Sequence, residues 1–335
     1  ISVLAGIGAS KDGGISADSD TRLSATSGNL VMTAGLYGGH INMASSTLQA
    51  TALGARIELT AQAGSVTQAK IAGIDTKGTS STADDVTIQV IAGLISADVL
   101  RVQADSGITL QTQVDTISLL KLKSAGSIEI VNTGNLLLSE AETFDGSVNL
   151  RTYGTLQVTA ARTLGSSDAN DMVFTATQAP NPTKTAANLV VGALTNAGRG
   201  DVLLQAEGAI STVGNSLILA DTLSVQASLV GLAAPGQEWL VNLATKVNAL
   251  NLNTDGAGNV QILQDKAAAN PTAARSLFAS TVLVSNGDLK IDAAGSVELG
   301  DVVLAANSSN NALTVLAGSD IVVRYASAGL YLASA

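Results

Sequence analysis

Three acidic residues, Glu140, Glu142 and Asp145, form the group in this sequence whose types and spacing could do chemistry. Two neighbouring carboxylates can act as an acid–base pair on a polysaccharide, or contact a cation or a glycan. Glu140 and Glu142 also fall at positions where a twenty-residue repeat, described below, has buried leucines. Because carboxylates are rarely buried without a partner, we favour a strand that slips here and buries Leu136 and Leu138 instead. In the alternative interpretation, Glu140 and Glu142 are ligand contacts on a modified face.

The only tryptophan, Trp239, follows Glu238, and this pair is a second candidate ligand contact. An indole ring can stack on a sugar, or it can cover a hydrophobic seam.

His40 is the only histidine and cysteine is absent, so a Ser-His-Asp triad or a metal site of histidine and thiolate has no support. We interpret His40 as a turn or surface residue.

Two further motifs are incomplete. Asp168, Asn170 and Asp171 begin like a calcium-binding loop, but the distant glutamate of such a loop is missing. The Gly-Ala-Gly sequence at 256–258 lacks the third glycine of a dinucleotide-binding loop and precedes a strand-like segment. We therefore predict no cofactor, no metal ion and no catalytic residue.

The composition limits the classes of partner. The formal net charge is −10, and the 17 Lys and Arg residues form no basic patch for nucleic acid. No apolar run approaches the roughly 18 residues of a membrane span. Apolar residues make up 46% of the chain and aromatic residues only 2%, so Val, Ile, Leu and Ala must fill the interior.

The elements that would position these residues recur about every twenty residues. Aliphatic residues alternate with polar ones, which predicts strands with one buried face, and glycines between the strands permit sharp bends. Residues 128–138 are echoed by 148–158, and residues 100–110 have the same spacing as 120–130. The predicted core residues are Leu100, Val102, Ile108, Leu110, Leu120, Leu122, Ile128, Ile130, Leu136, Leu138, Val148, Leu150, Leu156 and Val158.

A short repeat of this kind predicts an all-β solenoid of stacked coils. Each coil of about 20 residues would hold three short strands, and parallel strands of successive coils would lie about 4.8 Å apart. Residues twenty apart between 100 and 158 should then be vertical neighbours. We expect one continuous domain over residues 1–335, with about 13 to 15 coils. Because alternation persists at both ends, we expect this domain to be a segment of a longer protein.

Three stretches depart from the alternation and are expected to be insertions. Residues 164–187 contain two prolines, residues 231–246 contain the tryptophan, and residues 264–280 are rich in alanine. The third stretch could form a short helix after Pro271 that packs Leu277 and Phe278 onto the rod.

Three repeat lines resemble those of the large filamentous-haemagglutinin-like exoproteins of bacteria. They are LKIDAAGSVELGDVVLAA (289–306), IELTAQAGSVTQA (57–69) and VLLQAEGAISTVGNSLILA (202–220). The resemblance implies a right-handed parallel β-helix in an extracellular or cell-surface adhesin. It also implies, as partners, a glycan or protein on a host or neighbouring cell, or other copies of the same chain. The Asn-Pro pairs at 181–182 and 270–271 lack the Asn-Pro-Asn-Gly character of the family's secretion module, so the resemblance does not extend to the export route.

Three functions are compatible with this pattern. The first is a non-enzymatic shaft that gives an adhesin or filament rigid length. The second is a glycan- or protein-binding module that acts through its insertions. The third is a polysaccharide-degrading enzyme, which would need carboxylates gathered on one face; because the charged residues are scattered, we favour the shaft.

Overall fold

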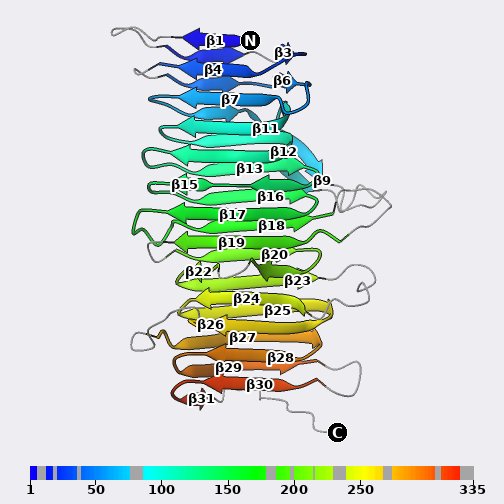
Figure 1. Ribbon diagram of the computed structural model, residues 1–335, viewed down its shortest axis with the longest axis vertical. Helices are drawn as coiled ribbons and strands as arrows, with labels where there is room; N and C mark the ends of the chain where they lie inside the picture. Colours follow the sequence, from blue (N-terminus) through cyan, green and yellow to red (C-terminus); the bar gives the residue numbers. More distant parts are fainter. Residues whose placement is uncertain are drawn as a thin grey trace.

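The computed structural model describes residues 1–5, 13–17, 21–35, 39–75, 86–178, 186–196, 200–213, 216–228, 239–266, 274–305 and 311–324. These residues form 31 strands and no helix, and 29 of the strands belong to one sheet. Every pairing within that sheet is parallel, and the strands stack in chain order from β1 to β31 along the long axis (Figure 1). The chain is therefore a parallel β-helix, as the repeat predicts.

One column of strands runs through the molecule without a break, because each member pairs with the next in parallel register. We call it the first strand column. Its thirteen members are β2 (Ile15–Ala17), β5 (Ile41–Met43), β8 (Val66–Gln68), the first part of β12 (Ile108–Leu122), β13 (Ile128–Thr133), β16 (Val148–Tyr153), β18 (Met172–Thr177), β20 (Val202–Ala206), β23 (Thr222–Ser228), β25 (Ala249–Ala257), β27 (Leu277–Asn286), β29 (Val297–Leu304) and β31 (Ile321–Val323). Twelve steps of about 4.8 Å make this column about 58 Å long.

The other faces of the coils hold the remaining strands of the large sheet. They are β1 (Ser2–Ala5), β3 (Arg22–Ala25), β4 (Leu30–Ala34), β6 (Thr47–Ala50), β7 (Arg56–Ala61), β11 (Leu94–Ala104), the second part of β12, β14 (Leu136–Leu138), β15 (Ala141–Thr143), β17 (Leu156–Thr163), β19 (Leu189–Asn196), β21 (Ile210–Thr212), β22 (Ile218–Leu219), β24 (Trp239–Lys246), β26 (Asn259–Gln264), β28 (Leu289–Ala293) and β30 (Leu313–Ala317). Each coil thus passes along the first strand column and then along these faces.

A hairpin leaves the solenoid between β8 and β11. Strands β9 (Lys70–Asp75) and β10 (Val86–Ile91) form the antiparallel pair of the second, two-stranded sheet. Lys70 Nζ lies 2.6 Å from the Glu129 carboxylate on β13, and this ion pair connects the base of the hairpin to the rod. Residues 70–75 lack the regular alternation of the coil strands, and no pattern in the sequence predicted an antiparallel hairpin here.

The predicted register holds across the middle of the chain. Ile108 pairs with Ile128 and Ile128 with Val148, and on the next face Leu136 pairs with Leu156. The prediction is wrong for residues 100–122, where Val102 pairs with Leu120 instead of Leu122.

The physical reason is the length of one corner: six positions lead from Leu122 to Ile128, whereas four lead from Ala104 to Ile108, so partners before that corner are fewer than twenty residues apart. A register shift between Leu100 and Arg101 changes the offset by one further residue. Elsewhere the coil length also departs from twenty. The offset between partners is 42 residues from Val66 to Ile108, where the hairpin is inserted, and 30 from Met172 to Val202.

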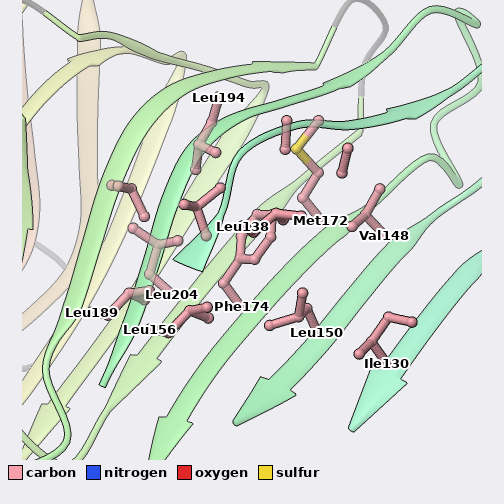
Figure 2. Close-up of a cluster of buried hydrophobic side chains, with 14 of the residues drawn as sticks. Ile130, Leu138, Val148, Leu150, Leu156, Met172, Phe174, Leu189, Leu194 and Leu204 are labelled. Carbon is pink, nitrogen blue, oxygen red and sulfur yellow. The ribbon is translucent and has the colours of Figure 1, made fainter. Parts of the chain in front are cut away.

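Inward-facing aliphatic side chains form one core that extends along the whole stack. The fourteen predicted core residues all lie in it, none more than 2% exposed. Phe174 is the largest fully buried side chain and lies among leucines of neighbouring coils (Figure 2). Each buried aliphatic side chain contributes about 1.5–3 kcal/mol, so neighbouring coils hold one another in place.

The three expected insertions are narrower than predicted. Strand β18 lies inside 164–187 and buries Met172 and Phe174, while residues 179–185 lie outside the described residues. Residues 239–246 of the second stretch are strand β24, and its residues 231–238 are not described.

In the third stretch, residues 267–273 are not described, and Leu277 and Phe278 begin strand β27. The expected packing of these two residues from a helix is therefore wrong. Leu277 reaches the core because it alternates with Ala279 along a strand.

Where the chain turns from one face of the coil to the next, backbone groups lack a partner strand, and buried side-chain amides form hydrogen bonds with them instead. Asn132 Oδ1 accepts hydrogen bonds from Val114 N at 3.0 Å and Thr112 Oγ1 at 2.8 Å. Gln264 Oε1 accepts from Val247 N at 3.3 Å, and its Nε2 donates to Val247 O at 2.7 Å. An unpaired buried backbone N–H costs about 1–3 kcal/mol, which these amides avoid.

Glycines are required where the corners of successive coils meet. A Cβ on Gly146 (φ +151°) would lie 1.9 Å from the Gly126 carbonyl oxygen of the coil before. Gly107 lies at the same corner, in the row of residues that follows the row of Gly126 and Gly146. A Cβ on Gly107 would have no neighbouring atom closer than 3.8 Å. In that row the adjacent coils have Ser65 and Ser127, which shows that side chains fit there.

The two glycine rows give a matched test of coil stacking. We expect Gly146→Ala to lower the free energy of unfolding by about 2 kcal/mol or more, because the backbone contact between coils must open. Gly107→Ala should change it by less than about 1 kcal/mol. Denaturant unfolding followed by far-UV circular dichroism measures both, and equal effects of the two substitutions would contradict the corner geometry.

Candidate functional site

Of the predicted acidic cluster, Glu142 lies on β15 and Glu140 directly precedes that strand, and cations of the neighbouring coils bind both. Lys121 Nζ lies 2.7 Å from Glu142 Oε1, and Arg162 forms an ion pair with Glu142 Oε2. The same Arg162 reaches Glu140 Oε1 at 3.2 Å. Lys121, Glu142 and Arg162 are successive register partners, so one charged ladder joins three coils.

The register confirms the predicted strand slip. Leu120 pairs with Ala141 rather than Glu140, and Ala141 takes the core position. Leu136 and Leu138 are also buried, as this interpretation requires. Glu142 is nevertheless only 6% exposed, because the ladder covers it from the coils on both sides.

The surroundings of Glu142 favour its charged form. Burial raises the pKa of this carboxyl group, but the hydrogen bonds and charges of Lys121 and Arg162 together outweigh burial and hold the pKa below its ordinary value of 4.5. A general acid needs a carboxyl group that keeps its proton near neutral pH. Glu142 is therefore placed to bind cations of its own chain and stabilise the stack.

The other predicted contacts stay apart from this ladder. Trp239 is half-buried at the start of β24, where it pairs with Asn259 across a register shift. Glu238 lies outside the described residues. His40 is exposed at a corner, as predicted, and its Nδ1 accepts a hydrogen bond from Ser65 N at 3.0 Å.

The calcium-like segment is also used internally. Asn170 Nδ2 donates to Asp145 Oδ1 at 2.8 Å, and Asp171 Oδ1 accepts from Asp201 N at 3.0 Å. Among the described residues, no three His, Cys, Asp or Glu side chains gather closely enough to hold a metal ion. Across the same part of the chain, no helix has the length and apolar character needed to cross a membrane.

A polar groove that was not predicted from the sequence lies on the solvent side of the first strand column. Its floor is a row of five register partners, one from each of β16, β18, β20, β23 and β25. We call it the polar row; it consists of Arg151, Thr175, Gln205, Gln226 and Asn253. The groove encloses about 580 Å³, a volume in the range of ligand-binding clefts.

Side-chain hydrogen bonds order the centre of the polar row. Thr175 Oγ1 donates to Gln205 Oε1 at 3.2 Å, and Gln205 Nε2 donates to Gln226 Oε1 at 2.6 Å. At one end, the Arg151 guanidinium lies 5.0 Å from the centre of the Tyr153 ring. These contacts hold the groups in a fixed orientation, which lowers the entropy lost when a ligand binds.

A signal for this groove does exist in the sequence. At the polar-row position these five strands carry amides, a hydroxyl and one guanidinium, whereas Leu283 follows Asn253 in the next coil. Only the register brings them together, and the coil lengths in this region vary too much to predict it from the repeat.

Comparison with known proteins identifies no relative: no family model, no curated protein and no solved structure matches this chain.

The charged ladder predicts a pH-dependent stability. Because the folded state lowers the pKa of Glu142, its contribution is fully present above about pH 4.5 and is lost as the pH falls through the lower folded value. We expect Glu142→Gln to lower the free energy of unfolding by about 1–2 kcal/mol at pH 7. The difference from the unsubstituted chain should shrink as the pH falls below 4.5.

Glu140→Gln is the matched control for this measurement. Its side chain is 45% exposed and, among the described residues, pairs with the single cation Arg162, so the substitution should have a much smaller effect at every pH. Urea unfolding at several pH values provides the comparison. A Glu142→Gln deficit that stayed constant down to pH 3 would contradict the assigned role of the ladder.

Proposed function

We propose that this chain is a non-enzymatic structural shaft of a bacterial cell-surface or secreted adhesin or filament. The observation that carries the proposal is the first strand column, in which thirteen strands pair in parallel one after the next, with register shifts only between β25 and β27. Each coil adds about 4.8 Å of length along one axis. The resemblance of the repeat lines to filamentous-haemagglutinin-like exoproteins supports the same class.

Three kinds of contact between coils support a stiff rod. The backbone ladder and the aliphatic core run along the whole stack, and the charged ladder joins three coils at its middle. Because all three act between neighbours along one axis, bending the rod would break contacts on one side of several coils together. Such a rod can hold an adhesive region at a fixed distance from a surface.

The arrangement of carboxylates favours this function over polysaccharide cleavage. The two carboxylates that the sequence offers for acid–base work, Glu140 and Glu142, are both engaged by Arg162. Glu142 also has a lowered pKa, the opposite of what a catalytic acid needs.

Pulsed electron paramagnetic resonance can test the shaft directly. The chain has no cysteine, so Asn42→Cys and Thr281→Cys introduce two specific spin-label sites on exposed positions of the first strand column. Nine coil steps separate β5 from β27, which corresponds to about 43 Å. We expect one narrow distance distribution near that value.

Deleting one coil provides the control. Removing residues 128–147 brings Val148 into register with Ile108, so the chain should fold and the labels should approach by about 4.8 Å. Removing only residues 128–137 takes out half a coil and should prevent folding of the stack, because it places Leu138 directly after Ser127. A broad distribution in the full chain, or an unchanged distance after the coil deletion, would refute a stiff shaft.

A further inference from the structure

We propose that the groove above the polar row binds an extended neutral glycan that lies along the long axis of the rod. The proposal goes beyond the shaft and does not depend on it, because a groove on one face could bind a ligand in a stiff or a flexible molecule. It also differs from binding through insertions, since every group of the polar row is on a strand.

The first argument is the chemistry of the groove floor. Thr175, Gln205, Gln226 and Asn253 offer hydroxyl and amide groups, which can both donate and accept hydrogen bonds. A primary amide has two N–H donors and two acceptor lone pairs, so a ladder that uses one of each leaves others for a ligand. Sugar hydroxyls also donate and accept, and they match such groups better than a purely apolar or purely anionic ligand does.

The second argument is spacing. Successive members of the polar row are register partners on strands about 4.8 Å apart, which is close to the length of one pyranose residue. The row covers four steps, or about 19 Å. A glycan of four or five sugars could therefore present one residue to each coil.

The third argument concerns charge. Two carboxylates, Glu207 and Asp255, line the groove together with a single guanidinium from Arg151. Glu207 Oε2 accepts a hydrogen bond from Gln178 N at 2.7 Å, which holds that carboxylate at the margin. An excess of negative charge disfavours a sulfated or uronic-acid polymer, so the occupant is neutral.

The fourth argument separates a glycan from a peptide. An extended peptide commonly binds a sheet by adding a strand to an unpaired edge. Strands β18, β20 and β23 are paired on both sides, so their backbone groups are already used by neighbouring coils. Recognition in this groove has to come from side chains, which suits a ligand rich in hydroxyls.

Isothermal titration calorimetry on the full chain tests the proposal with six-sugar probes. The neutral probes are cellohexaose, maltohexaose and chitohexaose; the anionic probes are a heparin hexasaccharide and hexagalacturonate. We expect at least one neutral probe to bind and the anionic ones not to bind. For that probe series, affinity should rise from the disaccharide to about the pentasaccharide and then level off, as the length of the row requires.

Variants locate the binding. The double substitution Gln205→Ala and Gln226→Ala should weaken binding about tenfold, because two amides are removed from the centre of the row. Asn253→Ala, on an exposed side chain at the end of the row, should weaken it about threefold with less risk to folding. Gln157→Ala, an exposed amide on β17 outside the groove, is the matched control and should have no effect.

Thermal unfolding of each variant shows that the stack is intact before affinities are compared. Three results would overturn the proposal: no neutral probe binds, an anionic probe binds in preference, or the Gln157 variant loses as much affinity as the groove variants.

Discussion

The structure depends on one constraint: each inward-facing side chain must pack on the side chain at the same place in the coil above and in the coil below. Ile108, Ile128 and Val148 satisfy it with nearly identical shapes, and Met172 and Val202 continue the same line. Parallel backbone ladders impose this repetition, because a strand that keeps its register also keeps its inward face. Aliphatic residues suit such columns better than rings, which accounts for an aromatic content of 2%.

Polar groups inside the rod obey the same constraint instead of interrupting it. Asn132 satisfies the backbone N–H of Val114, which belongs to the coil before. Glu142 forms ion pairs with Lys121 and Arg162, which come from the coils on either side of it. In both cases the buried polar group forms its bonds between coils, so its desolvation is offset by contacts that also hold the stack together.

Prediction from the sequence worked where coil length is constant. Partners lie twenty residues apart from β12 to β13, from β13 to β16 and from β14 to β17, so a fixed twenty-residue spacing gave the correct partners for Ile128 and Leu136. It was wrong at residue 102, because the corner before β13 is two residues longer than the corner before β12, while the alternation stays intact. Alternation records which side of a strand is buried, and it does not record which strand lies next to it.

The same limit accounts for the three features that the sequence did not reveal. Residues 86–91 of the β9–β10 hairpin alternate like a coil strand, and that pattern does not encode the antiparallel pairing that sets the hairpin apart. The strand from Met172 to Thr177 was assigned to an insertion because nearby prolines and polar residues obscure a short alternating run. The polar row needs the register of five coils at once, and the offsets between them range from 21 to 30 residues.

The core and the groove are independent because alternation separates them. Leu204 and Val225 face inward and fix the spacing of β20 and β23, while Gln205 and Gln226 face outward from the next positions along those strands. Substitution of an outward residue changes the chemistry of the face without changing the volume of the core. A stack of this kind can therefore acquire a row of recognition groups at coil spacing and remain a rod, so support and binding need not compete within one chain.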